Sequence, residues 1–380
     1  IVTEAQAIHP GFGFLSENSK FATLCEEMNI KFIGPSGEIM DKMGDKINAR
    51  AEMIRANVPV IPGSDGEVFT AEEALEVANR LGYPVMLKAS AGGGGKGIRK
   101  VNTKEELAPA FESASQEAKV SFGNGAMYIE KVIYPARHIE VQILGDSYGN
   151  IVHLGERDCS LQRNNQKVLE ESPSVAIGKT LRHEIGSAAV RAAKAVNYEN
   201  AGTIEFLLDE KSGQFYFMEM NTRIQVEHPV TEWVTGIDLI KEQIKIADGQ
   251  RLKLQQKDIK ITGHAIECRI NAENPEKNFR PSPGKITDVH FPGGEGVRVD
   301  SAIYTGYEVP PYYDSMLAKL IVHADDREEA IRKMRSALGE VIIEGVDTNI
   351  DYQYEILNHK KFISGDIDVE FIGGMMNETA

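Results

Sequence analysis

Polar and apolar residues alternate most regularly in the stretch FMEMNTRIQVEHPVTE, which begins at Phe217. Met, Thr, Ile and Val separate the polar positions, which are Glu219, Asn221, Arg223, Gln225 and Glu227. Successive side chains of an extended strand point to opposite faces, so the alternation predicts a strand through Glu227 that carries carboxylate, amide and guanidinium groups on one face. We expect that face to bind ions.

The residues just before this stretch predict the other half of a hairpin. Two strand patterns in GTIEFLLDEKSGQFYFMEMN flank the turn signal DEKSG. Glu205 and Glu219 are equidistant from Ser212, so the simplest antiparallel register places them opposite each other. Like charges directly opposite destabilise a sheet, and a divalent cation removes that repulsion. We therefore expect Glu205, Glu219 and Asn221 to bind Mg²⁺ (or Mn²⁺) that also contacts nucleotide phosphates; a shifted register with one solvated glutamate is the alternative.

A separate unit begins near residue 60, after the Pro- and Gly-rich run NVPVIPGSDG. Residues 70–82 predict a helix with a Thr cap and a Gly stop. The segments YPVMLKAS and GIRKV predict strands, and a helix over residues 103–122 and a strand over residues 126–133 follow. We expect a small α+β unit that ends near Lys131.

The two predicted strands of this unit are joined by the glycine loop KASAGGGGKGIRK. Glycine lets backbone N–H groups approach phosphate oxygens closely, and Lys88 and Lys96 add positive charge. The spacing fits G-x-G-x-x-G, but a strand follows where the dinucleotide motif needs a helix, and Gly97 after Lys96 excludes a P-loop. We expect a mobile cover over a nucleotide rather than a plain linker.

The rest of the chain predicts a mixture of α/β and antiparallel structure. Residues 21–33 have the pattern of a short amphipathic helix that leads into the strand IKFIGP. Further along, RHIEVQILGD and GNIVHLGERD predict antiparallel strands, TLRHEIGSAAVRAAKAV predicts a helix, and another α/β section begins near residue 260.

Composition narrows the classes of function. The 380 residues are 42% apolar and 26% charged, which is typical of a globular protein with two or three domains. The net charge of -15 argues against a general nucleic-acid binder, so local basic residues must hold any anionic substrate. No membrane span or signal peptide is apparent, and Cys25, Cys159 and Cys268 form no C-x-x-C pair, so we expect a cytoplasmic protein without disulfides or zinc.

Seven motifs together resemble the biotin carboxylase family of ATP-grasp ligases along nearly the whole chain. They are IHPGFGFLSEN, MGDK, KASAGGGGKG, RDCSLQR, MEMNTRIQVEHPVTE, HAIECRINAE and PPYYDSMLAKLI. The resemblance implies an α+β and α/β protein with an ATP-grasp fold. Its expected parts are a partial amino-terminal α/β domain (1–45), a mobile lid subdomain (60–132), a carboxyl-terminal ATP-grasp subdomain (133–260) and a biotin carboxylase carboxyl-terminal region (261–380).

The same resemblance implies a nucleotide site between the lid and the carboxyl-terminal sheet. ATP phosphates are expected at Lys46 and Lys88 under the glycines Gly93, Gly94 and Gly95. Adenine and ribose are expected near Glu130, Lys131, His138 and Gln162. From the residues alone, His138 is equally explained as a structural strand histidine and Lys131 as a solvated charge.

For the reaction, the resemblance implies that Arg223, Gln225 and the backbone of Val226 bind bicarbonate, on which Glu227 acts as a general base. Attack on the γ-phosphate gives carboxyphosphate, which breaks down to CO₂ and phosphate. Phosphate then takes the ureido proton of biotin, and Arg269 stabilises the resulting enolate, a role worth roughly 3 to 4 kcal/mol in comparable sites. Lys167 is expected among the catalytic groups.

Ordinary structural roles also fit several of these residues. Arg223 and Glu227 fit a surface ion pair, and Arg269 fits a pair with Glu267 or Glu273. Two positions differ from the family's usual pattern. Asn165 stands where histidine is common, and Ala91 stands where a further glycine is common.

The resemblance also implies partners. No Met-Lys-Met biotin attachment sequence occurs in the chain, so we expect a separate subunit that acts on a biotin carboxyl carrier protein; a domain cut from a longer carboxylase is the alternative. The resemblance implies carboxyltransferase subunits as further partners, in acetyl-CoA carboxylase and fatty acid synthesis, and a homodimer. The start at Ile1, close to a predicted loop, leads us to expect a preceding amino-terminal segment. The rival hypotheses are another ATP-grasp ligase similar to carbamoyl phosphate synthase, and a non-catalytic nucleotide-binding subunit.

Overall fold

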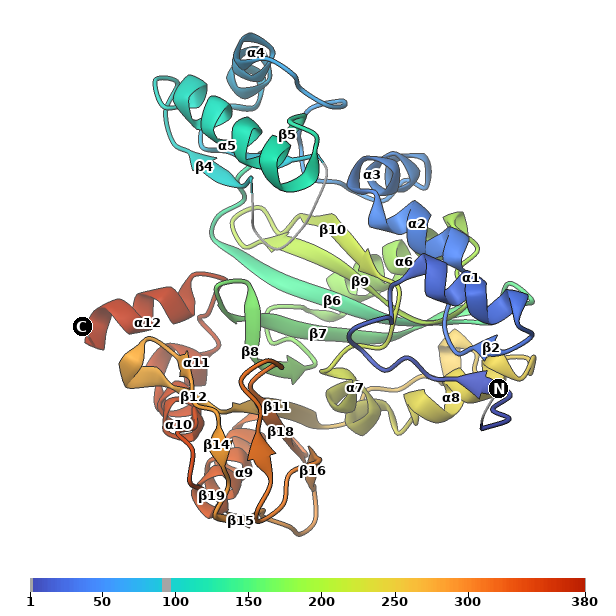
Figure 1. Ribbon diagram of the computed structural model, residues 1–380, viewed down its shortest axis with the longest axis vertical. Coiled ribbons are helices and arrows are strands. Elements are labelled where there is room, and N and C mark those ends of the chain that lie inside the picture. The colour runs from blue at the N-terminus through green and yellow to red at the C-terminus, as the bar shows by residue number, and fades with distance from the viewer. Residues whose placement is uncertain (1–2, 91–96, 380) are drawn as a thin grey trace.

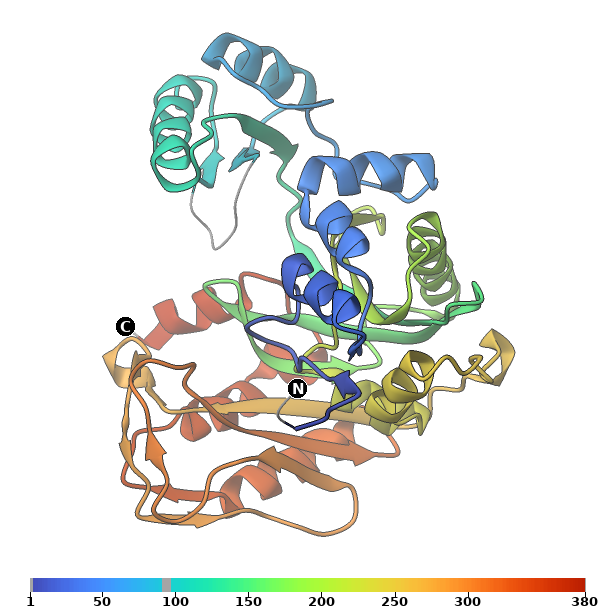
Figure 2. The same ribbon diagram turned by 45° about the vertical axis from the view of Figure 1, so that its right-hand side comes forward.

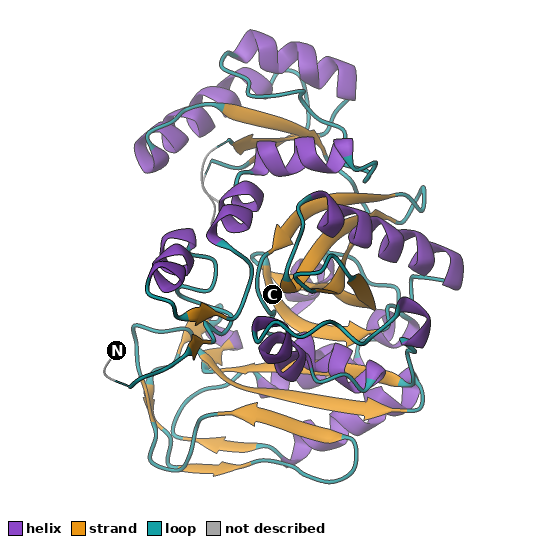
Figure 3. Cartoon of the chain, turned by 90° about the vertical axis from the view of Figure 1, so that its right-hand side faces the viewer, coloured by secondary structure: helices purple, strands orange, loops and turns teal. Residues whose placement is uncertain are grey.

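An eight-stranded antiparallel sheet runs through the centre of the computed structural model, which describes residues 3–90 and 97–379 (Figures 1 and 3). In order across the sheet, the strands are β10 (Phe215–Asn221), β9 (Asn200–Asp209), β6 (Ala136–Gly145), β7 (Ile151–Arg163), β8 (Gln166–Ser172), β11 (His264–Asn271), β18 (Met316–Ala324) and β16 (Val297–Ser301). The predicted antiparallel strands beyond residue 137 are therefore confirmed. Since β8 pairs with β11, residues on both sides of the boundary expected near 260 share one sheet.

Helices cover the sheet at both ends. Helix α6 (Lys179–Ala195) lies on β6 and β7, close to the predicted span of 180–196. Its buried face is mostly alanine, so the helix can approach the sheet closely. At the other end, α9 (Arg327–Glu340) packs on β11 and β18 beside α10 (Ile350–Asn358), α11 (Lys360–Ser364) and α12 (Phe371–Thr379).

The small unit expected to form a lid, called the lid below, projects from the main sheet (Figures 1 and 2). It consists of a three-stranded sheet, β4 (Arg99–Val101), β3 (Val85–Ala89) and β5 (Met127–Lys131), covered by α4 (Ala71–Leu81) and α5 (Leu107–Phe122). The side chain of Thr70 accepts a hydrogen bond from Glu73 N, and Gly82 ends α4 with φ of 74°. The predicted cap, stop and strands are confirmed.

The segment that enters the lid runs beside β10. The backbone N–H of Phe217 donates to the carbonyl of Pro59 at 2.7 Å, and Val60 forms a parallel bridge with Phe217. Two further bridges, from Gly63 to Glu130 and from Val68 to Met127, continue into the lid sheet. The lid is thus joined to the main sheet next to the predicted metal-binding strand.

The amino-terminal part contains the expected helix and strand, α1 (Ser19–Glu27) and β2 (Lys31–Phe32), and β2 pairs in parallel with β1 (Ala7–Ile8). Two further helices, α2 (Gly37–Gly44) and α3 (Lys46–Arg55), were not predicted. The sequence signals for these two helices were their N-cap residues. The side chain of Ser36 accepts from Ile39 N, and the side chain of Asp45 accepts from the N–H groups of Ile47 and Asn48.

The prediction of one strand through Glu227 was wrong. Strand β10 ends at Asn221, residues 222–227 are irregular, and α7 (His228–Thr235) follows. The reason is a competing partner: the N–H of Thr222 donates to the side chain of Glu17 at 2.9 Å, instead of continuing the ladder. A bulge at Met218 also shifts the register between Phe217 and Glu219.

Short strands complete the carboxyl-terminal part, in three two-stranded sheets. These pair β12 (Glu273–Asn274) with β13 (Arg280–Pro281), β14 (Gly284–Lys285) with β17 (Glu308–Val309), and β15 (Asp288–His290) with β19 (Ile342–Glu344). Helix α8 (Leu239–Ala247) follows α7 and packs on β9. None of the helices in the described ranges has the length and apolar character needed to cross a bilayer.

Candidate active site

A cavity of about 1200 Å³ lies between the lid, the amino-terminal segment and the main sheet. Most of the predicted site residues line it: Lys46, Lys88, Glu130, His138, Gln162, Lys167, Glu205, Glu219, Asn221, Arg223, Gln225, Val226, Glu227 and Arg269. Lys131 is not among the lining residues. Gly93, Gly94 and Gly95, like Ala91 and Lys96, lie outside the described residues.

A row of charged residues crosses four neighbouring strands at the floor of the cavity, where Glu205 and Glu219 line it and Glu140 and Arg157 are fully buried. Arg157 on β7 is opposite Glu140 on β6. Glu140 is opposite Glu205 on β9, and Glu205 is opposite Glu219 on β10. The predicted pairing of Glu205 with Glu219 is therefore confirmed, although the bulge at Met218 makes the hairpin less regular than the symmetric register assumed.

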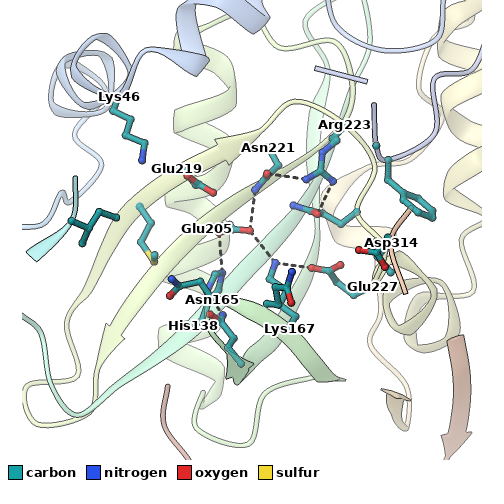
Figure 4. Close-up of a pocket in the computed structure, with 18 of the residues that line it drawn as sticks. Lys46, His138, Asn165, Lys167, Glu205, Glu219, Asn221, Arg223, Glu227 and Asp314 are labelled. Atoms are coloured by element: carbon teal, nitrogen blue, oxygen red, sulfur yellow. Dashed lines mark hydrogen bonds and ion pairs between the residues drawn. The ribbon is translucent and has the colours of Figure 1, made fainter. Parts of the chain in front are cut away.

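Lys167 on β8 lies at this row and pairs with two of its carboxylates and with Glu227 (Figure 4). Its Nζ is 2.6 Å from Glu140 Oε2, 3.0 Å from Glu205 Oε1 and 2.7 Å from Glu227 Oε1. Although burial by itself would lower the pKa of Lys167, the three carboxylates raise it well above its usual value. The ammonium group therefore stays charged and holds carboxylates from three elements together.

Glu205 and Glu219 differ in how their charges are compensated. Glu205 accepts from Lys167 and from Asn221 Nδ2 at 2.9 Å, and its Oε2 is 3.0 Å from His138 Nε2. Although burial would raise the pKa of Glu205, Lys167 and His138 lower it. Glu219 is open to the cavity, where partial desolvation and then the charge of Glu205 raise its pKa. One acid of the pair is thus satisfied, and the other is available to a ligand.

Arg223 leaves the end of β10 and is held on several sides. Its Nε donates to Glu17 Oε2 at 2.8 Å, its Nη1 donates to Gln225 Oε1 at 2.8 Å, and its Nη2 is 3.4 Å from Asn221 Oδ1. Its ion pair is with Glu17, so the alternative of a surface pair with Glu227 is wrong. The guanidinium instead lines the cavity (Figure 4).

Glu227 and Arg269 face each other at the opposite side of the cavity floor. Arg269 Nη2 donates to Glu227 Oε2 at 2.9 Å, and Arg269 Nε donates to Glu170 Oε1 at 2.6 Å. The alternatives of a pair with Glu267 or Glu273 are therefore wrong. Although burial would raise the pKa of Glu227, Lys167 and then Arg269 hold it well below its usual value. Glu227 is thus fixed in the ionised form, which is the form that accepts a proton.

Burial dominates at Glu170, the second carboxylate partner of Arg269. It raises the pKa of Glu170 to about 7, against the opposing effect of Arg269. On the same strand, Glu171 behaves oppositely: its hydrogen bond with His264 and the charge of Arg327 outweigh burial and lower its pKa to about 2. Below neutral pH, Glu170 therefore favours the protonated form, whereas Glu171 stays ionised until the pH approaches 2.

The remaining candidate residues come from the lid, from strands β6 and β7 of the main sheet, and from α3. Lys88 on β3 forms an ion pair with Glu130 on β5. Gln162 Nε2 lies 2.7 Å from His138 Nδ1 and fixes that ring at the cavity wall. Lys46, at the start of α3, extends toward Glu219 in Figure 4.

Lys131 departs from the expected arrangement. Its Nζ donates to the carbonyls of Gly82 at 2.7 Å and Tyr83 at 3.3 Å, so the side chain caps the end of α4. Asn165, in the turn between β7 and β8, lines the cavity with φ of 64°. It offers a neutral amide where the family commonly has an imidazole.

Sequence reasoning missed four charged residues that build the site: Glu17, Glu140, Arg157 and Glu170. Arg157 is fully buried and donates to Gln142 Oε1 at 2.8 Å, Thr231 Oγ1 at 2.9 Å and Thr203 Oγ1 at 3.1 Å, besides its pair with Glu140. The available signal was a charge inside an otherwise buried strand pattern, which applies to Glu140, Arg157 and Glu170. Glu17 gave no such signal.

Family models match most of the chain. Residues 1–40 match the biotin carboxylase N-terminal domain, residues 45–255 match the carbamoyl-phosphate synthase L chain ATP-binding domain, and residues 267–374 match the biotin carboxylase C-terminal domain. The second match explains why a ligase similar to carbamoyl phosphate synthase was a rival hypothesis. The flanking models distinguish this chain from carbamoyl phosphate synthase.

Relatives and solved structures agree. Biotin carboxylase 1 of Bacillus subtilis is 57% identical over 98% of this chain and 82% of its own length. A pyruvate carboxylase subunit of Methanothermobacter thermautotrophicus is 54% identical over 97% of this chain and 74% of its own. The structure of biotin carboxylase from Campylobacter jejuni matches with a TM-score of 0.94 and 52% identity, covering 98% of this chain and 83% of that one.

A second solved structure was determined with ligands. It is the biotin carboxylase domain dimer of 2-oxoglutarate carboxylase from Hydrogenobacter thermophilus, in complex with MgADP, ADP and bicarbonate; its TM-score is 0.93 at 52% identity, over 98% of this chain and 82% of that one. The predicted ATP-grasp fold is confirmed by these matches. The chain belongs to the biotin carboxylase family, and it is an ATP-dependent ligase that carboxylates biotin.

Proposed function

We propose that the charged row on the main sheet divides the reaction between two groups of residues. Glu205, Glu219 and Asn221 serve the metal–nucleotide end, and Arg223, Gln225 and Val226 bind bicarbonate. The observation that carries this proposal is the continuous lining of one cavity by both groups, next to Glu227. Bicarbonate is found in the 2-oxoglutarate carboxylase relative, which supports the same substrate here.

The residues at the metal–nucleotide end fit Mg²⁺. The open carboxylate of Glu219 lies opposite Glu205, and their repulsion is the kind that a divalent cation relieves. Carboxylate and amide oxygens are ligands that Mg²⁺ prefers, and Asn221 supplies an amide beside them. When bound, the metal neutralises phosphate charge.

Glu227 is the proposed base. It is ionised because the positive charges of Lys167 and Arg269 lower its pKa. It also lies between the residues proposed to bind bicarbonate and Arg269, the residue proposed to act on biotin. Bicarbonate, oriented by the Arg223 guanidinium, loses its proton to Glu227 and attacks the γ-phosphate of ATP. Carboxyphosphate forms and ADP leaves; carboxyphosphate then gives CO₂ and phosphate.

Arg269 is proposed to act in the second half of the reaction. The phosphate released from carboxyphosphate removes the ureido proton of biotin, and the Arg269 guanidinium stabilises the enolate oxygen until the ureido nitrogen attacks CO₂. Its present partners, Glu170 and Glu227, keep it fixed at the cavity floor. Lys167 keeps the carboxylates around both substrates in place.

For ATP, we propose phosphate contacts from Lys46, Lys88 and the loop glycines Gly93, Gly94 and Gly95. Glu130, His138 and Gln162 are proposed near adenine and ribose. Lys131 is left out of this group, because its side chain donates to the carbonyls of Gly82 and Tyr83 and does not line the cavity.

We further propose that a biotin carboxyl carrier protein presents the biotin, that carboxyltransferase subunits use the product, and that the chain forms a homodimer. Several relatives are named biotin carboxylase, which favours acetyl-CoA carboxylase and fatty acid synthesis. A pyruvate carboxylase subunit is almost as similar, so acceptor assays should include pyruvate. We also propose that the chain is divided into domains at residues 45, 60, 132 and 260. A cytoplasmic location is likewise proposed.

The test is ATP hydrolysis by the full-length protein with bicarbonate, with and without free biotin. Stimulation by biotin is expected, and Glu219→Gln should weaken use of Mg-ATP. Arg269→Ala should preserve ATP binding and reduce biotin carboxylation about 100-fold. Equal loss of ATP binding in both variants would contradict the proposed division of roles.

A further inference from the structure

Glu17 connects the amino-terminal segment with the end of β10. It precedes α1 and lies 206 residues before Arg223 in the chain. Oxygen Oε2 of Glu17 accepts from Arg223 Nε at 2.8 Å. Oxygen Oε1 accepts from the backbone N–H of Thr222 at 2.9 Å and from its hydroxyl at 3.3 Å. One carboxylate therefore fixes both the backbone and the side chain at the point where the strand ends.

These contacts use one edge of the guanidinium and leave another edge toward the cavity. The ionic partner, Glu17, is on Nε, whereas the Nη groups contact neutral acceptors on Gln225, Ile224 and Asn221. A bound anion forms stronger, charge-assisted hydrogen bonds than a neutral amide does. An anion in the cavity can therefore replace the amide contacts at Nη while the contact at Nε persists.

The exposure of the pair agrees with such a division. The Arg223 side chain is 19% exposed and lines the cavity, whereas the Glu17 side chain is 39% exposed and is not a lining residue. Glu17 thus holds the guanidinium from behind. A flexible arginine side chain loses considerable rotamer freedom when it is fixed, and a partner that fixes it beforehand lowers that cost at the moment of binding.

We propose that Glu17 is a positioning residue for bicarbonate, which aims the Nη edge of Arg223 into the cavity. The proposal rests on the proposed role of Arg223. It predicts that the amino-terminal segment contributes to bicarbonate affinity without contacting the substrate.

The experiment measures the KM for bicarbonate and the KM for ATP in biotin-dependent ATP hydrolysis by the full-length enzyme. Glu17→Ala should raise the KM for bicarbonate about tenfold, the effect of losing one hydrogen bond to a charged group, and change the KM for ATP less than about twofold. Glu17→Gln retains an oxygen that accepts from Nε, so it should recover part of the affinity. Because it also preserves side-chain size, it carries the test if the alanine variant does not fold.

Glu27→Gln, which changes an exposed acid in α1, is the matched control and should leave both KM values as in the wild type. The proposal is overturned if the Glu17 variants raise both KM values equally or leave the KM for bicarbonate unchanged. Arg223→Ala separates the two levels of argument. If it leaves the KM for bicarbonate unchanged, the proposed bicarbonate site itself fails; if it raises that KM and Glu17→Ala does not, only the role of Glu17 fails.

Discussion

The two sides of the cavity differ in how far their charged side chains are buried and paired. On the main sheet, the carboxylates of Glu140, Glu205 and Glu227 are buried and already paired with the half-buried ammonium group of Lys167. Toward the lid, Lys46 is exposed, and Lys88 pairs with Glu130 at a partly exposed position. The sheet side is therefore organised before substrate arrives, as a site for a small reacting anion requires. The lid side carries the positive charge that we propose for the phosphates of the nucleotide.

The largest effect is expected from removing the positive charge of Lys167, which pairs with all three buried carboxylates of the sheet side. Lys167→Met leaves three carboxylates without their shared partner, so we expect a loss of about 3 to 5 kcal/mol in the free energy of unfolding and no detectable turnover. Urea unfolding and bicarbonate-dependent ATP hydrolysis check this. Lys179→Met, an exposed lysine at the start of α6, is the control and should change stability by less than about 0.5 kcal/mol. A Lys167→Met protein as stable as the control would contradict the buried network.

The lid side should respond in binding rather than in stability. Lys88→Met removes a proposed charge-assisted contact with phosphate, so the KM for ATP should rise at least about tenfold. Because the pair with Glu130 is partly exposed, the free energy of unfolding should change by less than about 1 kcal/mol. Steady-state kinetics and urea unfolding of the same preparation measure both. A large loss of stability with an unchanged KM would reverse the comparison.

Protonation sharpens the comparison within the sheet side. With a pKa of about 7 in the fold and an ordinary value of 4.5, Glu170 keeps a proton that the unfolded chain has already released. Its contribution to stability is present below pH 4.5 and is lost as the pH rises through 7. Glu170→Gln should therefore remove part of the stability decrease between about pH 5 and pH 8, measured by urea unfolding. Glu171 has the opposite sign, with stability lost as the pH falls from 4.5 through 2.

For Glu171→Gln, the expected difference from wild type is constant between about pH 5 and pH 8, because Glu171 stays ionised over that range in both states. If both variants show the same pH dependence, the assigned difference between the two neighbouring acids is wrong.

The smallest effect is expected at Lys131. Its side chain donates to backbone carbonyls and does not line the cavity, so Lys131→Met should leave the KM for ATP within about twofold of wild type. Compared with Lys88→Met, it separates a lysine that faces the cavity from one that supports α4. An equal rise in KM for both variants would restore the expectation that the Lys131 side chain contacts the nucleotide.

What the sequence predicted well was local. The lid elements followed from caps, glycine stops and strand patterns, and the Glu205–Glu219 pair followed from the symmetry of one hairpin. These features depend on residues that are close together in the chain, so their spacing carries the information. The motif resemblance added the residues that line the cavity.

What the sequence could not supply was the strand order and long-range partners. The row from Arg157 to Glu219 exists because β7, β6, β9 and β10 are neighbours in the sheet. In the chain, β8 and α6 separate the pair β6 and β7 from the pair β9 and β10. Likewise, the end of β10 at Asn221 depends on Glu17, which lies about 200 residues earlier. Alternation alone predicted a longer strand because it contains no information about a competing hydrogen-bond acceptor.

The hydrogen bond between Phe217 and Pro59 has a mechanical consequence. It places the attachment point of the lid directly beside the strand that carries Glu219 and Asn221. A rotating body moves least near its axis. Rotation of the lid about this attachment would therefore displace β10 very little, and it would displace α4, at the far end of the lid, the most. If the lid moves as proposed, Glu219 and Asn221 would therefore keep their spacing.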